Sequence, residues 1–547
     1  MKRIHVLLFL LFLSFLPLLD LFHPGLPVGH DTPDHVARIA NFYQSISEGN
    51  IIPRWAGNLN WGYGHPILMF LYPLPSYAAS FFHAIGFSFV DSTKLVFAVS
   101  YIASTLAMYL FASTAWGATS GVIAAVLYGF APYRFVDLYV RGAIGEHMAF
   151  VFPPLIFYGM LRMTKNHRGI AGGVITALSM AGLILSHNAV ALMMLPLVLL
   201  YGVYLFVYEA KNKLHFLFLV FCLLSIGFLL SAFFWMPAFF EGKYTLRDIV
   251  TKGDFITRFV PWQWLFVSPW NYGGGNEFTK ELGVVHWVSI LGGIVVCIRA
   301  KARALRWLMG GCIALVSISL LLMTVESKFV WEYVTILQKF QFPWRFLTIP
   351  VIVSPILGAI TFTHVPKRFH LLIVFCLLSI AAITTASMWR AKEYIVKPEE
   401  YYSGIYESTT DTGESSPIWS VRFMERRPNA MYDVIEGEAT IAPGLRKTTS
   451  HEFVVSAKSD ARVVDNTLYF PGWTVAVDDR QLDLVQELIY QDPNYRGLMT
   501  FRVPPGTSRV VVSFGETKLR KVANILSISG LVAIVLYEAF RRYRHLQ

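Results

Sequence analysis

The sequence contains 547 residues, of which 55% are hydrophobic and only 15% are charged, and its formal net charge is +11. This composition excludes an ordinary soluble enzyme and indicates a polytopic membrane protein. The net charge does not indicate a nucleic-acid partner, because the basic residues lie in short clusters between hydrophobic runs, as in cytoplasmic loops under the positive-inside rule. All four cysteines fall inside apolar runs, so neither a disulfide framework nor a zinc site is expected.

Hydrophobic runs occur along most of the chain and predict about 12–13 spans, since a bilayer requires ~20 apolar residues. Residues 4–22 form the first run, and because no small-residue cleavage site follows, we expect them to remain as a span. The further runs lie near 67–89, 95–115, 119–136, 147–163, 170–186, 188–208, 214–235, 283–298, 307–324, 346–363, 369–389 and 522–540.

The basic clusters predict how these spans are oriented. Placing every cluster in the cytoplasm puts both termini inside. Three runs lie between Lys94 and the cluster at Lys165, so either Lys94 lies outside or one run does not cross. We interpret the proline-interrupted run 65–89 as an interfacial or re-entrant piece, which also places Arg141 and Glu146 outside. The segments expected outside are 23–66, 236–282, 325–345 and 390–520.

A helix is expected in the first outer loop, 23–66. Thr32 is a suitable N-cap and Pro33 suits the first helical position, so the helix should begin there and run to about Glu48. Its spacing predicts an amphipathic helix lying on a bilayer surface, with its polar face toward water or a cavity in the protein. The polar face comprises Asp34, His35, Arg38 and Asn41, and the apolar face comprises Val36, Ile39, Ala40, Tyr43 and Ile46.

The start of this helix carries candidate functional residues. His30 and Asp31 directly precede it, so two carboxylates, two imidazoles and a guanidinium lie together beside the membrane. Helix capping is the alternative reason for Asp31 and Asp34 to be there. His30, Asp31, Asp34 and His35 could hold a divalent metal ion, but solvated polar side chains are commoner on such a helix. No cofactor is therefore assigned with certainty.

The segment from Lys392 to Lys521 is polar and alternates in hydrophobicity, which predicts a β-rich outer domain. The expected organisation is a membrane domain at 1–390, a β-sandwich-like domain at 391–520, and a last span with a basic cytoplasmic tail at 521–547. Strands are expected at Tyr432–Ile441, Glu452–Ala457, Ala461–Phe470, Trp473–Val477, Met499–Val503 and Arg509–Phe514.

Several multi-residue motifs carry a resemblance to known families. With its first outer loop, many spans and outer β domain, the chain resembles the GT-C superfamily of membrane glycosyltransferases. It is more closely similar to the bacterial membrane family named "6-pyruvoyl-tetrahydropterin synthase-related" and its YfhO-like relatives. The motifs are His30-Asp31 with Asp34-His35, Asn60-Trp61-Gly62-Tyr63-Gly64-His65-Pro66, Tyr72-Pro73-Leu74-Pro75, Arg141-Gly142-Ala143 with Glu146, Ser186-His187-Asn188, Gln341-Phe342-Pro343-Trp344-Arg345-Phe346 and Tyr469-Phe470-Pro471-Gly472-Trp473.

The GT-C resemblance implies inverting transfer of a sugar from a polyprenyl phosphate to a glycan, lipid or protein acceptor, with an acid of the first outer loop as base. On that basis Asp31 is the expected base, and Arg141 or Arg345 the expected phosphate ligand, because a guanidinium holds phosphate through two donors. Glu146 is the alternative base. The first loop lacks an Asp-x-Asp or Glu-x-Asp pair, which leaves metal dependence open.

Purely structural roles stay open for some of these residues. Arg141 and Glu146 could form a mutual ion pair at a span edge, and Trp344 and Arg345 could be interfacial anchors. The expected substrate-binding set is His30, Asp34, His35, Arg38, Arg141, Trp344 and Arg345.

Two further functions compete with the glycosyltransferase. One is a non-catalytic scaffold or carbohydrate-binding protein that keeps the fold. The other is a transporter or flippase, against which the chain shows no internal two-fold repeat. The expected location is a bacterial inner membrane, surrounded by membrane lipid, with both termini in the cytoplasm.

Overall fold

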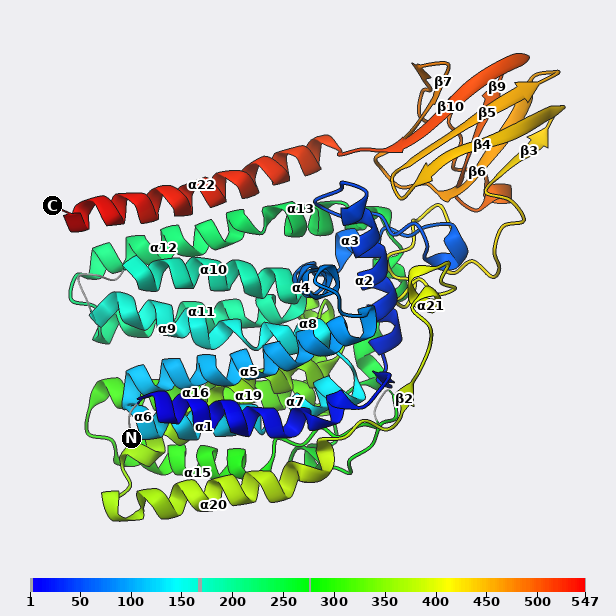
Figure 1. Ribbon diagram of the computed structural model, residues 1–547. Helices are drawn as coiled ribbons and strands as arrows, with labels where there is room; N and C mark the ends of the chain where they lie inside the picture. Colours follow the sequence, from blue (N-terminus) through cyan, green and yellow to red (C-terminus); the bar gives the residue numbers. More distant parts are fainter. Residues whose placement is uncertain (1–2, 166–169, 275–276, 547) are drawn as a thin grey trace.

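The computed structural model describes residues 3–165, 170–274 and 277–546, and it consists of a helical bundle with a β domain at one end (Figure 1). Within these residues, nine helical segments are long and apolar enough to span a membrane, one bent pair passes the same test, and two shorter apolar helices accompany them. This confirms the predicted polytopic helical architecture. The long helices are α1 (Arg3–Phe15), α5 (Phe89–Trp116), α9 (Phe152–Lys165), α10 (Ile170–Ser186), α11 (Asn188–Tyr208), α12 (Lys213–Leu230), α15 (Val284–Arg299), α16 (Arg303–Met323), α19 (Thr348–Thr363), α20 (His370–Thr385) and α22 (Lys518–Leu546).

The two ends of the bundle differ in what they carry. The β domain lies at one end, which we call the β-domain end, whereas the first residues of α1 and the last of α22 lie at the other, which we call the termini end (Figure 1). The basic stretch around Arg299–Arg303, between α15 and α16, also lies at the termini end. This is the arrangement that the positive-inside rule predicts if the termini end is cytoplasmic.

The run 67–89 does not form a span. It is divided into α3 (Ile67–Phe70) and α4 (Leu74–Ala84), and α4 lies across the bundle rather than along it (Figure 1). Lys94 donates a 2.9 Å hydrogen bond to the backbone oxygen of His23, which follows the first span. Lys94 therefore lies at the β-domain end. From there the three segments at 89–116, 118–140 and 144–164 lead to Lys165 at the termini end, so Lys94 and Lys165 lie at opposite ends of the bundle and all three runs can cross.

The expected span at 119–136 is broken. Helices α6 (Ala118–Gly129) and α7 (Pro132–Phe135), the latter continued by a π-helical turn to Val140, meet at an angle of 50°. Pro132 cannot donate to a preceding carbonyl, so the helix ends before it and restarts in a new direction. This bend directs the turn at 141–143 into the β-domain end.

The expected helix of the first loop is α2 (Thr32–Ser47). The predicted N-cap was one residue off: Asp31 occupies that position, with no side-chain cap bond, while Thr32 donates its hydroxyl to the backbone oxygen of Pro27 at 2.8 Å. The expectation that α2 lies on a bilayer surface was also wrong, because both of its faces are covered by protein. Its polar residues His35, Arg38 and Asn41 are buried, as are its apolar residues Val36, Ile39 and Ala40.

The region after α20 is rich in β-strands, as expected, and its strands form a two-sheet sandwich. They are β3 (Tyr432–Glu436), β4 (Ala439–Lys447), β5 (Ser450–Ala457), β6 (Ala461–Leu468), β7 (Trp473–Val477), β8 (Arg480–Gln481), β9 (Leu498–Val503) and β10 (Gly506–Phe514). One sheet has the order β4-β5-β10-β7-β8 and the other β3-β6-β9, and neighbouring strands in both are antiparallel. The single strand expected at 432–441 is two strands. Gly437 separates them with a φ of +81°, and a Cβ there would come within 2.5 Å of the Asp460 backbone oxygen.

The Tyr-Phe-Pro-Gly-Trp motif at 469–473 attaches the sandwich to the bundle. Arg520, at the start of α22, is fully buried and donates to the backbone oxygen of Pro471 at 2.6 Å. The same guanidinium donates to Oε2 of Glu241, which follows α13 (Ala232–Phe240), at 2.8 Å. One arginine thus connects the β domain, the last helix and the bundle.

We expect Arg520→Met to lower the free energy of unfolding by about 3–5 kcal/mol, because the buried Glu241 carboxylate would lose its charge partner. The matched control is Arg509→Met. Arg509 forms a surface ion pair with Glu452 at 3.0 Å, and such a pair contributes at most about 1 kcal/mol to stability. Thermal unfolding of the purified protein in detergent, followed by tryptophan fluorescence, measures both. Equal shifts for the two variants would contradict the role given to Arg520, and Arg520→Met with Glu241→Gln should recover most of the loss.

Candidate functional site

The start of α2 and the turn after the bent helix lie side by side. The backbone N–H of His30 donates to the oxygen of Val140, and that of Asp31 donates to the oxygen of Arg141, both at 3.0 Å. Gly29 packs so closely on this turn that a Cβ would come within 3.0 Å of the Gly142 nitrogen. Two segments separated by about 110 residues are therefore fixed to each other at the β-domain end.

Arg141 is held by two buried carboxylates. Its Nη1 atom donates to Oδ1 of Asp137 at 2.5 Å and to Oε2 of Glu146 at 2.7 Å. The second oxygen of Glu146 accepts from the Tyr133 hydroxyl at 2.6 Å and the Thr348 hydroxyl at 3.0 Å. Glu146 is fully buried and both of its oxygens are occupied, so the mutual ion pair weighed for Arg141 and Glu146 is present and leaves Glu146 poorly suited to act as a base.

A group of cations and rings surrounds the guanidinium of Arg141. Its carbon lies 4.4 Å from the Trp344 ring centre, and the rings of Phe278 and Phe342 lie 5.1 and 5.2 Å from that of Trp344. Arg345 stacks on Phe342 at 4.8 Å, and its buried Nε has no hydrogen-bond partner in the described part of the chain. We call this group the cationic-aromatic cluster; it consists of Arg141, Phe278, Lys280, Phe342, Trp344 and Arg345.

Lys280 was not singled out in the sequence. It is 1% exposed, its Nζ lies 3.7 Å from the Phe278 ring centre, and it donates to the backbone oxygen of Phe278 at 2.7 Å. Burial, and next the positive charges of Arg141 and Arg258, lower its pKa to about 7. No ion pair to Lys280 is found among the residues described. The only signal in the sequence was a lysine between aromatic residues in an outer segment.

Asp31 and His30 lie at the rim of this cluster. His30 is exposed; its Nε2 is 3.1 Å from the backbone oxygen of Tyr272, and its ring is 6.0 Å from that of Phe278. Asp31 is exposed, and within the described chain its carboxylate has no hydrogen-bond or ion-pair partner. Asp31 occupies the N-cap position without a side-chain cap bond, so its carboxylate is free to accept a proton or a hydrogen bond.

The other expected residues of α2, Asp34, His35 and Arg38, are less exposed than Asp31. Burial raises the pKa of Asp34, against the Arg38 charge, and the side chains of Tyr406 and Ser408 hydrogen-bond its carboxylate. Burial also holds the pKa of His35 well below its usual value, so its ring is neutral. Arg38 is 5% exposed, and its buried Nε is unpartnered within the described residues. A backbone group of Gly142 and the charge of Arg141 both act on the His35 ring, so His35 lies next to the turn that carries Arg141.

The metal hypothesis for His30, Asp31, Asp34 and His35 finds no support in this geometry. Across the described residues, no three His, Cys, Asp or Glu side chains come together as a metal-binding group. The helix separates the four, because His35 points into the protein while His30 and Asp31 are exposed.

The remaining motifs fix the architecture. In the Asn60–Pro66 motif, the backbone nitrogens of Asn60 and Trp61 donate to the oxygens of Ser408 and Tyr406, both at 2.9 Å. In the Ser186-His187-Asn188 motif, Nδ1 of His187 accepts from the Val190 nitrogen at 3.2 Å and so caps α11. Neither motif contributes a side chain to the cationic-aromatic cluster.

Several solved structures match this chain in part. The arabinofuranosyltransferase AftD from Mycobacteria matches with a TM-score of 0.49 and 15% identity, over 71% of this chain and 27% of that one. The Archaeoglobus fulgidus oligosaccharyltransferase tethered with an acceptor peptide matches with a TM-score of 0.46 and 15% identity, over 76% of this chain and 61% of that one. ArnT from Cupriavidus metallidurans bound to undecaprenyl phosphate matches with a TM-score of 0.38 and 13% identity, over 73% of this chain and 67% of that one.

Sequence comparison gives one relative and one family match. An uncharacterized protein of Lactococcus lactis subsp. cremoris (strain MG1363) is 27% identical over 257 residues, which is 46% of this chain and 42% of that protein. Residues 68–394 match a family described as "6-pyruvoyl-tetrahydropterin synthase related domain; membrane protein". That range is more than half of the chain and includes Arg141, Glu146, Lys280 and Arg345. As its motifs led us to expect, the chain belongs to the 6-pyruvoyl-tetrahydropterin synthase related family of membrane proteins.

Proposed function

We propose that this protein is an inverting membrane glycosyltransferase, which moves a sugar from a polyprenyl-phosphate donor to an acceptor hydroxyl. We further propose that the β-domain end faces the outside of a bacterial inner membrane and that both termini are cytoplasmic, since the basic clusters gather at the termini end. The observation that carries the proposal is the contact of the cationic-aromatic cluster with the segment bearing Asp31.

The cluster suits the phosphate of the donor. Arg141 uses its Nη1 atom for its carboxylates, so its other donors can point toward a phosphate, and Arg345 and Lys280 add two further cations. When the bond between the anomeric carbon and the phosphate oxygen breaks, negative charge develops on the departing polyprenyl phosphate. Cations held in place before the reaction stabilise that charge without reorganising.

Asp31 is the proposed base. Its carboxylate takes the proton of the acceptor hydroxyl as the hydroxyl oxygen forms its bond to the anomeric carbon on the face opposite the phosphate. The configuration at that carbon inverts, and the electron pair of the broken bond leaves with the polyprenyl phosphate. The exposed position of Asp31 leaves room for a polymer, lipid or protein acceptor.

Asp137 and Glu146 are proposed as positioning residues. They bind Arg141 from the protein side and fix the direction of its remaining donors. The Arg141 guanidinium also stacks over the Trp344 ring, and this contact further restricts the motion of the guanidinium. Asp34, His35 and Arg38, with the neighbouring Tyr406, are proposed to border the acceptor.

The experiment that tests this function compares a deletion strain complemented by the wild type or by Asp31→Asn. We expect the deletion to lack one glycan or glycolipid and to accumulate its polyprenyl-phosphate sugar, and Asp31→Asn to behave like the deletion although it inserts normally. Unchanged glycans and glycolipids in every strain would reject the enzyme in favour of the binding protein. Protein-dependent flipping of a labelled lipid in proteoliposomes, without transfer, would instead favour the transporter.

The pKa of Lys280 predicts a pH dependence of donor binding. Its pKa of about 7 means that it is cationic below that pH and neutral above it, so the KM for the donor should rise as the pH increases from about 6 to about 8. Lys280→Arg should keep KM low across this range, because a guanidinium stays charged, and Lys280→Met should keep it high. Initial rates with a labelled donor measure this; the same pH profile in all three proteins would contradict the role of Lys280.

A further inference from the structure

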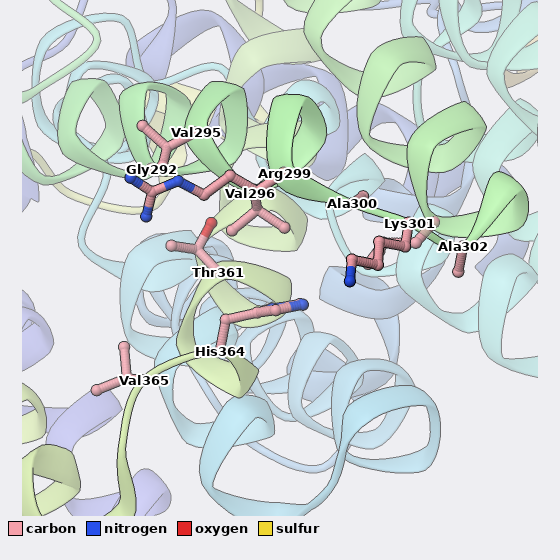
Figure 2. Close-up of a pocket in the computed structure, with 11 residues that line it drawn as sticks. Gly292, Val295, Val296, Arg299, Ala300, Lys301, Ala302, Thr361, His364 and Val365 are labelled. Carbon is pink, nitrogen blue, oxygen red and sulfur yellow. The ribbon is translucent and has the colours of Figure 1, made fainter.

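A second region of interest lies at the termini end, opposite the cationic-aromatic cluster. A pocket of about 550 Å³ is formed between the ends of α15 and α19 and the chain that leads into α16. Figure 2 shows that Lys301 and His364 direct their nitrogens toward the same space, while the guanidinium of Arg299 lies on the other side, beside Val295. The pocket therefore combines cationic groups with an aliphatic wall.

The positive charge of this pocket is not balanced by its surroundings. The lining segments 292–305 and 361–365 contain no Asp or Glu, and neither do the neighbouring stretches 282–325 and 333–392. Arg299 and Lys301 are exposed and, in the described part of the chain, form no ion pair. An anionic ligand would supply the missing counter-charge.

A polar group in the pocket wall also lacks a partner. Most threonines in these helices donate to a carbonyl one turn back, as Thr385 does to Ala381 at 2.7 Å and Thr93 to Phe89 at 2.9 Å. The hydroxyl of Thr361 is buried without any such bond within the described residues, and Figure 2 shows it directed toward α15. It is a donor available to a ligand oxygen.

An apolar surface continues from the pocket along α15. Val288, Leu291 and Val295 lie on one face of this helix at the spacing of successive turns, and they are 63%, 60% and 47% exposed. Gly292 lies beside them, and a Cβ there would come within 2.7 Å of Thr361 Cγ2, so the absence of a side chain keeps α15 and α19 close. A hydrocarbon chain that starts at the pocket can follow this face toward the middle of the bundle.

We propose that this pocket binds an anionic glycerophospholipid from the leaflet at the termini end. Its phosphate lies between Arg299 and Lys301 and accepts from Thr361, and one acyl chain follows the Val288–Val295 face of α15. Basic pockets between spanning helices are suited to anionic headgroups at such a surface. This site is independent of the proposed transfer reaction, because it lies at the opposite end of the bundle.

Native mass spectrometry of the full-length protein, released from nanodiscs of equal parts phosphatidylglycerol and phosphatidylcholine, tests this site. We expect one phosphatidylglycerol to be retained over phosphatidylcholine by about 25-fold, since Arg299 and Lys301 should each favour an anionic lipid by about 5-fold. Arg299→Gln with Lys301→Gln should abolish the preference, and Thr361→Val should reduce it without changing the charge.

The matched control is Lys367→Gln with Arg368→Gln, which removes two cations from the same end of the bundle but outside the pocket. It should keep the full preference. The proposal is overturned if the two double variants lose the preference equally, or if neither loses it. It is also overturned if soluble glycerol 3-phosphate displaces the lipid at millimolar concentration, since the pocket would then select a free phosphate ester.

Discussion

Asp31→Asn is expected to reduce the rate of sugar transfer by at least about 100-fold, because general-base catalysis typically contributes that much or more. The substitution keeps the size of the side chain, and since the Asp31 carboxylate has no described partner, the free energy of unfolding should stay the same. The KM for the polyprenyl-phosphate donor should also change little. Turnover of a labelled donor by the purified protein in proteoliposomes measures the rate.

The matched control for Asp31→Asn is Asp248→Asn. Asp248 is another exposed aspartate, in the segment 236–282, and it forms a surface ion pair with Lys339 at 2.7 Å. It should retain the wild-type rate. If Asp31→Asn kept full activity in a protein that transfers sugar, another group would have to be the base, and the assignment of Asp31 would be wrong while the enzyme function survived.

Arg141→Gln is expected to cost about 3–5 kcal/mol of stability, because it leaves the buried carboxylates of Asp137 and Glu146 without their cation. It should also abolish transfer. Adding Glu146→Gln to this variant removes one uncompensated charge and should recover much of the stability, whereas transfer should remain absent. The apparent Tm in detergent and the transfer rate separate the two effects.

Two outcomes would contradict this role of Arg141. A double variant that regains transfer along with stability would show that Arg141 serves the fold alone. A single variant as stable as the wild type would show that the two carboxylates do not depend on it. Arg141→Lys provides a graded comparison, because an ammonium keeps the charge but cannot present several fixed donors at once.

The sequence predicted the architecture well because its signals are local. The long apolar runs, the basic clusters and the alternating strands each depend on neighbouring residues, and they indicated the bundle, the non-spanning run 67–89 and the β domain. The departures from the predicted boundaries are small: the helix α2 begins at Thr32 rather than after it, and one strand is divided at Gly437. Both depend on single-residue backbone geometry.

The candidate site was only partly predictable, because it depends on contacts between distant segments. The motifs identified Asp31, Arg141 and Arg345. They could not reveal that the Asp31 carboxylate is free whereas both oxygens of Glu146 already accept hydrogen bonds. Lys280 was missed because the alternation of the sequence does not reveal its burial, to which Trp264, sixteen residues earlier and 5.4 Å away, contributes. The surface position expected for α2 failed for the same reason, since α21 (Glu400–Ser403) packs on it and Tyr406 and Ser408 hydrogen-bond Asp34.

The pairing of the loop after the first span with segments beyond α20 has a consequence for how the chain is made. Strand β1 (Leu26–Pro27) hydrogen-bonds with β2 (Tyr394–Ile395), and Asn60 with Ser408, so partners are separated by about 350 residues. A ribosome working from the N-terminus delivers this loop long before its partners emerge. The loop must therefore wait without these partners while most of the spans are inserted, and its pairing is completed only after residue 408 has been made.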